Sequence, residues 1–489
     1  MRLGILFLAV VVSVFAHEKT ETNKHKLLLN MTQIYQKEPP KVQCISEMFT
    51  EGIWYGRLRT NNFGFKWKDE LQVNGKEVRK DHALAGFGGS LIYRSGYLYG
   101  FGVGAGVYAS MGIGTLKRNE AYLYKSGKDM FSRYDKLTKN KNTMFSLAQA
   151  YIEYNYQKSK VTFGRQIFES FLTRSNDTKM IPNTFEGLTF VTKEIPQTTL
   201  KAAYLTRQKL KDHTKFHHVL AWATPLSDNP YTVYTQNDDT AMHRGLTLER
   251  LQQAGIHDRL FVFEIKNQSI ERLQLRANYT EVPELLSSAM VQADYTFDVG
   301  IWHIIPSIRY MQQFDNGAGT IGGAALKGKS FTQGYRNPTD LDSWLLGVRT
   351  DIIKGAFKLR LGYTKVADRG DIVAPWRGFP TAGFTRAISQ YNWYADTKTY
   401  MVQVGYRFKD LKDLSILGRY AYQDFDDNKP AVQADSHVLS LDVMKGFNGI
   451  CNRYVKVRYA HVWGKPQTGE IKKLDPSYDE LRIEFNYLF

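Results

Sequence analysis

Two glycine-rich segments match motifs that bind phosphate. Residues 323–330, G-A-A-L-K-G-K-S, fit the Walker A pattern, in which backbone amides and a lysine hold phosphates. A phosphate loop follows a buried strand and opens a helix, whereas this segment lies between N-G-A-G-T-I-G and F-T-Q-G-Y-R-N-P-T. The second match, Gly100-x-Gly102-x-x-Ala105, is a loose dinucleotide fingerprint whose glycines alternate with apolar residues. This alternation excludes a turn into a helix, so we predict that neither segment binds a nucleotide.

Catalytic and metal-binding patterns are equally weak. The 11 histidines and the 2 cysteines, Cys44 and Cys451, lack the spacing of a zinc site. The sequence contains no convincing Ser/His/Asp arrangement. We therefore predict that the protein is not an enzyme and uses no metal or cofactor. Two cysteines also exclude a disulfide scaffold, and the sequence leaves open whether they pair.

The remaining chemistry is that of lysine and arginine. The formal net charge is +17, with 65 Lys and Arg against 48 Asp and Glu. The cations are spread along the chain and not clustered, which favours a charged channel over nucleic-acid binding. Arginine suits such a channel because its guanidinium stays charged and binds a carboxylate through two parallel hydrogen bonds.

The C-terminal residues 477–489 indicate which elements position these charges. Apolar residues from Leu481 to Phe489 alternate with polar ones, and this period of two is typical of a strand with one lipid-facing side. The chain ends on Phe489, which resembles the C-terminal signature of bacterial outer-membrane barrel proteins. We therefore predict an all-β transmembrane antiparallel barrel in the bacterial outer membrane, recognised by the barrel-insertion machinery through Phe489.

The chain is predicted to divide into three parts. Residues 1–16 have the charge, apolar run and small-residue end of a secretory signal peptide, too short for a spanning helix. Residues 17–51 show little periodicity and are predicted to be a periplasmic N-terminal leader. Residues 52–489 form the barrel domain. Its alternating strands explain how a chain with 13% aromatic residues can have a mean hydropathy of −0.40.

The alternation predicts about eighteen strands, joined in turn by short periplasmic turns and long external loops. Residues 207–257 could contain a further hairpin around 217–222 and 246–251, so sixteen or twenty strands remain possible. The predicted segments are 52–64, 82–94, 97–111, 143–156, 159–168, 184–193, 197–206, 258–267, 270–280, 285–297, 300–314, 341–353, 356–366, 396–408, 413–424, 436–446, 453–463 and 477–489.

One external loop is predicted to fold into the pore. Gly100, Gly102, Gly104 and Gly106 share one strand face, which suggests close approach of a loop backbone, although a solvated wall with little packing demand is the alternative. The candidate loop is 169–183. Its polar side chains, which bring both charge signs to a constriction, are Arg174, Asn176, Asp177 and Lys179.

Several motifs here resemble a known family. The segments are G-R-Q at 164–166, D-T-K-M-I-P-N-T-F-E-G at 177–187 and K-A-A-Y-L-T-R-Q at 201–208, supported by M-F-x-x-G at 48–52 and A-M-H-R-G-L-T-L at 241–248. Over most of the mature chain they are similar to the OprD-type substrate-specific porins, in their epsilonproteobacterial form. The resemblance implies an eighteen-stranded monomeric barrel with an inward third loop. It also implies a basic ladder that guides carboxylate-bearing solutes.

Strand phase identifies the candidate ladder, because residues between lipid-facing positions point inward. We expect nine inward cations on the C-terminal strands, against the inward acids Asp351, Asp442 and Glu484. Ordinary wall residues placed for solubility are the alternative. The nine are Arg309, Arg349, Lys358, Arg360, Arg407, Arg419, Lys456, Arg458 and Arg482.

The sequence thus predicts an outer-membrane channel for small hydrophilic solutes, including carboxylate-bearing amino acids, organic acids and peptides. A non-specific general porin and a surface adhesin that uses the external loops are the alternatives. The expected partners are small-molecule solutes and outer-membrane lipid, without nucleic acid. The expected assembly is a monomer or a weak homotrimer.

Overall fold

The computed structural model describes residues 25–27, 31–73, 75–114, 117–125, 127–222, 241–388, 390–408, 411, 413–447, 452–468 and 471–489. The predicted signal peptide and Cys451 lie outside the described residues, while Cys44 is exposed. Within the described ranges, no helix has both the length and the apolar character needed to cross a membrane.

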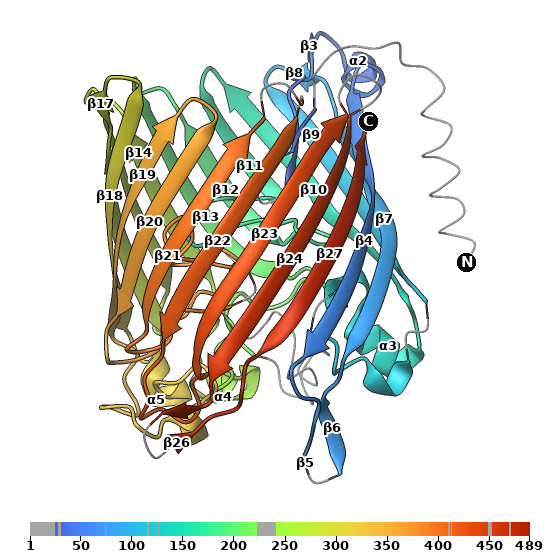
Figure 1. The fold of residues 1–489 in the computed structure, drawn as a ribbon. Coiled ribbons are helices and arrows are strands. Elements are labelled where there is room, and N and C mark those ends of the chain that lie inside the picture. Colours follow the sequence, from blue (N-terminus) through green and yellow to red (C-terminus); the bar gives the residue numbers. More distant parts are fainter. Residues whose placement is uncertain are drawn as a thin grey trace.

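The described chain forms a closed antiparallel barrel of eighteen long strands (Figure 1). The last strand closes it by pairing with the strand before it and with the first long strand. The predicted all-β barrel is confirmed, and each of the eighteen predicted segments overlaps one long strand. These strands are β4 (Ile53–Trp67), β7 (His82–Arg94), β9 (Phe101–Ile113), β10 (Thr143–Tyr156), β11 (Ser159–Gln166), β12 (Thr184–Thr192), β13 (Thr198–Lys209), β14 (Leu260–Asn267), β15 (Leu273–Val282), β16 (Leu286–Tyr295), β18 (Trp302–Asp315), β19 (Ser343–Lys354), β20 (Phe357–Val366), β21 (Lys398–Arg407), β22 (Leu414–Asp424), β23 (Asp435–Phe447), β24 (Arg453–Lys465) and β27 (Tyr478–Leu488).

Most of the shorter elements lie at the two ends of the barrel. The short strands are β1 (His25–Leu27), β2 (Gln33–Tyr35), β3 (Lys41–Val42), β5 (Leu71–Val73), β6 (Lys76–Arg79), β8 (Tyr97–Leu98), β17 (Phe297–Val299), β25 (Gln467–Thr468) and β26 (Ile471–Lys472). The helices are α2 (Ile45–Thr50), α3 (Arg133–Lys139), α4 (Leu248–Gln253) and α5 (Ala318–Gly322), with 3-10 turns η1 (Arg118–Glu120), η2 (Lys128–Met130) and η5 (Lys329–Phe331).

The two ends of the barrel differ as predicted. Short turns and the C-terminus lie at one end, and the long loops that carry α3, α4 and α5 lie at the other (Figure 1). Short turns mark the periplasmic end and long loops the external end of an outer-membrane barrel. Along each strand the two faces alternate. In β23, for example, Leu439 and Leu441 are exposed while Ser440 and Asp442 are buried, so the apolar face points to lipid and the polar face inward.

The C-terminal residue fits a recess in β4. The Phe489 amide donates to the Gly56 carbonyl at 3.2 Å, and the Gly56 amide donates to the Phe489 carbonyl at 2.8 Å. A Cβ at residue 56 would lie 2.5 Å from the Phe489 ring, so this position requires glycine. The final aromatic residue therefore helps to seal the seam between the first and last strands.

Two sequence expectations need correction. Residues 207–257 add no barrel hairpin in their described part, because 248–253 form the helix α4 and 217–222 make only isolated bridges. Gly102 and Gly104 face the interior, but the groups that approach them are the rings of Tyr97 and Tyr151 and not a loop backbone. Gly100 lies in the turn before β9 with φ of 89°.

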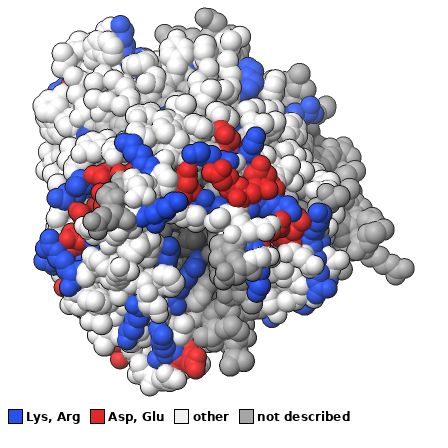
Figure 2. Space-filling model, turned by 60° about the horizontal axis from the view of Figure 1, so that its bottom comes forward, with Lys and Arg blue, Asp and Glu red and all other residues white. Residues whose placement is uncertain are grey.

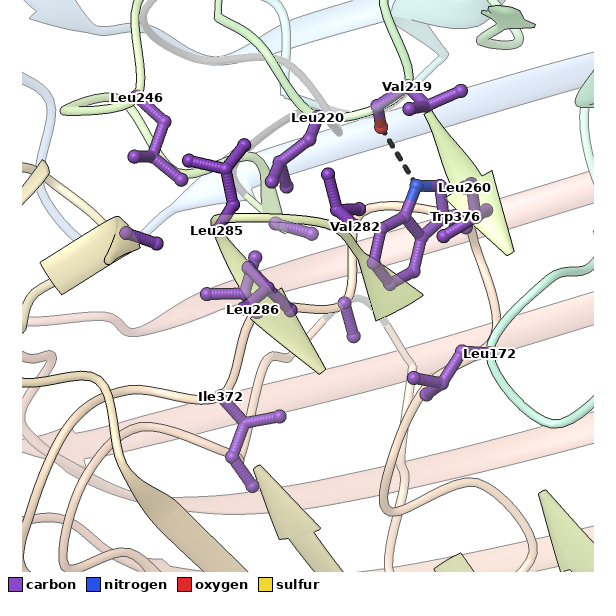
Figure 3. Packing of buried hydrophobic residues seen from close by; sticks show 14 of the residues in the cluster. Leu172, Val219, Leu220, Leu246, Leu260, Val282, Leu285, Leu286, Ile372 and Trp376 are labelled. Carbon is purple, nitrogen blue, oxygen red and sulfur yellow. Dashed lines mark hydrogen bonds between the residues drawn. The ribbon is translucent and has the colours of Figure 1, made fainter. Parts of the chain in front are cut away.

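The largest apolar core lies inside the barrel and joins its loops to its wall. Its members come from loop 167–183, from the loops around 219–251 and 372–376, and from the interior faces of strands β12 to β20. Figure 3 shows Trp376 at one side of this cluster, where its indole N–H donates to the Val219 carbonyl at 2.8 Å. Burial of these side chains keeps three loops folded inward instead of extending into solvent.

Candidate pore constriction

Loop 167–183 is held against the barrel wall by three interior side chains of β4. Arg57, Arg59 and Asn61 are spaced by two residues and therefore share one strand face. Asp177 forms a buried ion pair with Arg57 and accepts from Arg59 at 2.7 Å. The Asn61 amide donates to the Lys179 carbonyl at 2.8 Å. These contacts fix the loop inside the barrel.

The predicted constriction residues have different environments. Asp177 was expected to present a negative charge at the constriction, but its carboxylate is buried between two guanidinium groups. Lys179 lies 3.6 Å from Asp129 and above the Phe63 ring. Arg174 pairs with Glu169 at 3.2 Å and is partly exposed.

Part of the predicted periplasmic leader also reaches this loop. The Met31 carbonyl accepts from Arg57 at 2.7 Å, and the Thr32 hydroxyl contacts the Ser175 hydroxyl. Tyr35 stacks on Tyr55 with 5.0 Å between ring centroids. Because Tyr55 and Arg57 lie on the interior face of β4, residues 31–35 enter the barrel from the periplasmic end.

A second inward loop, 367–397, packs against the first. The Arg174 amide donates to the Trp376 carbonyl at 2.9 Å, and the Gly378 amide donates to the Leu172 carbonyl at 2.8 Å. A Cβ on Gly378 would lie 2.3 Å from Leu172 backbone. The sequence reasoning treated residues 367–395 as an ordinary external loop. Its many aromatic residues, several of them fully buried in the structure, were the signal that it packs inside.

The two loops and the wall enclose a narrow, basic opening. It is a cavity of about 100 Å³ lined by six cationic side chains and one acidic side chain. Seen from the external end, a hollow lies near the centre of the molecule and is bordered by Lys and Arg side chains (Figure 2). The lining residues are Asn176, Thr178, Lys179, Lys211, Arg377, Phe379, Arg386, Ile388, Tyr391, Arg458, Glu480 and Arg482.

Three of these cations were not predicted. Lys211 follows β13, and its ammonium group donates to the Thr178 hydroxyl at 3.0 Å. Arg386 lies above the rings of Phe379 and Tyr391, at 4.5 and 5.1 Å from their centroids. The third is Arg377. All three come from external loops, where strand phase gives no information about direction.

The structure places most of the predicted ladder cations in acid-paired clusters on the interior wall. Asp351 binds Arg360 through both oxygens, at 2.6 and 2.8 Å, and Lys358 at 2.9 Å. Asp442 pairs with Arg419 at 3.0 Å and with Arg458 at 2.5 Å. The three acids that the sequence identified as inward therefore act as counter-ions within the ladder, since Glu484 likewise pairs with Arg482 at 2.5 Å.

The other predicted cations differ in their surroundings. Arg309 is buried and donates to the carbonyls of Pro380 and Ala382, at 2.7 and 2.9 Å. Arg349 donates to Asp294 at 2.6 Å, an acid that the sequence reasoning missed. These two arginines hold the loop 367–397 to the wall. Arg407 is exposed at the periplasmic end, and neither it nor Lys456 has an acidic partner within 4.0 Å among the described residues.

A buried histidine joins two external loops next to the glycine-rich segment 323–330. His243 Nε2 donates to the Gly323 carbonyl at 2.8 Å, and the Gly245 amide donates to Nδ1 at 3.1 Å. Burial lowers the pKa of His243 to about 4, so the ring is neutral at pH 7. The glycine-rich segment follows the helix α5 and leads into η5. It lacks the order of strand, loop and helix found in a phosphate loop.

The barrel, its inward loops and its polar lumen define an outer-membrane porin. The sequence pattern described as "outer membrane porin, OprD family" matches residues 56–460, and the chain belongs to this family. It is a channel for small solutes in the outer membrane. No curated protein matches the chain.

Solved porins share the fold at low sequence identity. OccAB3 of Acinetobacter baumannii is 16% identical with a TM-score of 0.67, over 90% of this chain and 100% of that one. OpdK of Pseudomonas aeruginosa, in a crystal structure with vanillate, is 14% identical with a TM-score of 0.64, over 90% and 99%. OpdQ of Pseudomonas aeruginosa is 16% identical with a TM-score of 0.64, over 91% and 99%.

Proposed function

We propose that the channel favours small carboxylate-bearing solutes. The observation that carries this proposal is the opening of about 100 Å³ lined by six cations and one acid. An anion in this opening meets a positive local field, because fixed charges in a narrow passage raise the local concentration of counter-ions. Arg377, Arg386, Arg458 and Arg482 also offer planar guanidinium groups suited to carboxylates.

The ladder on the strand wall, two of whose members, Arg458 and Arg482, already line the opening, extends the positive field. The nine ladder cations exceed the four acids that pair with them, Asp294, Asp351, Asp442 and Glu484. Paired acids keep the arginines oriented while the wall remains positive overall. A solute carboxylate that leaves the opening thus passes to Lys456 and Arg419 on adjacent parts of the wall. The related OpdK has been crystallised with vanillate, itself a carboxylate, which supports this substrate class.

The size of the effect follows from the dimensions of the opening. In a cavity of about 100 Å³ the lining charges lie roughly 6 Å from the centre. At this distance in water, the attraction between one lining cation and a carboxylate at the centre is about 0.7 kcal/mol. Salt at 0.1 M leaves about half of this energy. Removing two charges should therefore lower the carboxylate concentration in the opening about fourfold. At 1 M salt the change should be less than twofold.

The test compares benzoate with benzamide, which have similar size but differ in charge, in proteoliposomes at 0.1 M salt. The double variant Lys211→Gln and Arg386→Gln should lose about fourfold in benzoate flux relative to benzamide flux. The matched control, Arg336→Gln with Lys472→Gln, removes two exposed loop cations that do not line the opening. The control should keep the wild-type ratio. An unchanged ratio in the first variant would make a general porin the better description.

A further inference from the structure

Two hollows lie near β13 and β14, away from the pore; the first is formed mainly by the loop that joins these strands, and the second lies on their lipid-facing side. The external hollow, of about 350 Å³, is lined by Arg207, Arg259 and His257 together with the loop residues Phe216 and His218. The second hollow, of about 420 Å³, lies further along the same two strands and is almost entirely apolar. Its lining residues include Leu188, Phe190, Ala202, Tyr204, Phe261 and Phe263.

The apolar hollow is a groove with a small floor and aromatic sides. In the strand register, Ala202 lies between Phe190 of β12 and Phe263 of β14. Tyr204 and Phe261 are paired one step closer to the external end. Phe261 and Phe263 are exposed although they are large and apolar, as expected for side chains that face lipid. An apolar groove with a small residue at its floor and aromatic residues at its sides is suited to an acyl chain.

The two hollows follow one another along β13, at residues 202–204 and 206–207, so one amphiphile could reach both. Residue 207 lies five positions from residue 202, which corresponds to about 16 Å along the strand. Arg207 is followed by the long loop 210–259, and Arg259 ends that loop, so both arginines lie at the external end of the membrane-spanning region. A ligand with its charged group between them would extend its apolar part along Ala202.

The charge of the external hollow favours an anion. Arg207 and Arg259 are exposed, and neither has an acidic partner within 4.0 Å in the part of the chain that the structure describes. Asp258 also lines this hollow, but its carboxylate is already engaged, since it accepts from His218 at 2.8 Å and from the Leu220 and Ala221 amides at 2.6 and 2.8 Å. Glu186, the nearest acid on β12, pairs with Arg165 at 3.6 Å.

We propose that these hollows bind a phosphorylated acyl lipid of the outer leaflet, with its phosphate between Arg207 and Arg259 and one acyl chain in the groove along Ala202. Guanidinium groups bind phosphate through charge-assisted and often bidentate hydrogen bonds, and basic pockets at the membrane surface recognise lipid head groups in this way. A protein partner fits less well, because the apolar half of the site lies in the lipid-facing band of the barrel.

The test measures diphosphoryl lipid A bound to the detergent-purified full-length protein by native mass spectrometry. The double variant Arg207→Gln and Arg259→Gln should lower the bound fraction at least fivefold. Ala202→Trp, which fills the groove on a lipid-facing surface, should lower it by a similar factor. Arg336→Gln with Lys472→Gln, two exposed cations of other external loops, is the charge-matched control and should bind as the wild type does.

Three outcomes would overturn the proposal. The first is equal lipid A binding by the wild type and the double arginine variant. The second is that inorganic phosphate binds with the same affinity as lipid A and that Ala202→Trp does not change this affinity, which indicates a site for free phosphate. The third is a dimer of the chain that the arginine substitutions dissociate, which indicates that a second copy covers this face. Lipid A without its phosphates should bind only as weakly as the lipid binds to the double variant.

Discussion

Replacing Asp177 by Asn should open the constriction. Asp177 is the shared counter-ion of Arg57 and Arg59, and all three side chains are almost completely buried. The substitution keeps the size of the side chain but leaves two adjacent guanidinium groups without a negative partner. The two guanidinium groups then repel each other and no longer bind residue 177. Loop 167–183, which carries this residue and lines the opening, is therefore held less firmly to the wall.

The magnitude follows from the burial. Removing one partner of a buried ion pair costs about 3–5 kcal/mol, because the remaining charge stays buried without compensation. An energy of this size changes the equilibrium between the docked and the released loop by a factor of roughly 150 to 5,000. The contacts of Asn61 and the packing of Leu172 with Trp376 remain, so the loop should be released for part of the time and not permanently.

Single-channel recording in planar bilayers measures this release. The Asp177→Asn channel should visit states of higher conductance that the wild type lacks. Removing the charges of all three residues, with Gln at positions 57 and 59, should restore a conductance closer to that of the wild type. Asp475→Asn is the control, because its pair with the exposed Lys68 should contribute at most about 1 kcal/mol. Wild-type conductance in Asp177→Asn, with no effect of the triple change, would refute the proposed role of this ion pair.

Three further predictions concern the loops and the wall. Folding depresses the pKa of His243 from 6.5 to about 4, so its contribution to loop docking should be complete above pH 6.5 and fall by on the order of 3 kcal/mol as the pH drops to about 4. Hydrogen exchange near residues 243–246 should increase over this range in the wild type but not in His243→Gln, and pH-independent exchange in the wild type would contradict the assignment. Trp376→Ala should cost about 3–5 kcal/mol of loop packing and raise conductance, whereas an unchanged pore would show that the loop core is dispensable. Asp442→Asn should shift the reversal potential toward anions and Arg458→Gln should shift it toward cations, and shifts of the same sign would exclude the paired-ladder account.

The sequence predicted the barrel because its evidence is local and repeated. Each strand shows its own period of two, and short and long connections alternate independently of that pattern. Phase also indicated which face Asp442 and Arg458 occupy. Phase could not show that these two side chains would pair, because the pairing depends on strand register and on the rotamers of long side chains.

The residues that line the opening could not all be predicted from strand phase. Lys211 and Arg386 lie on loops, where no period relates neighbouring residues and direction is set by distant contacts such as the Trp376 hydrogen bond to Val219. Asp177 was recognised in sequence, but its partners Arg57 and Arg59 are about 120 residues away along the chain. Its charge was therefore assigned to the pore when it is neutralised in the wall.

The most direct test of the central claim is the reversal potential of the wild-type channel in a planar bilayer with a KCl gradient centred on 0.1 M. A positive opening predicts that the channel prefers the anion, and that the reversal potential keeps the same sign when chloride is replaced by acetate. The preference should become smaller when all concentrations are raised toward 1 M, where the screening length is about 3 Å. A reversal potential that shows cation preference at low salt, in either chloride or acetate, would contradict the proposal that six cations around the opening select carboxylate-bearing solutes.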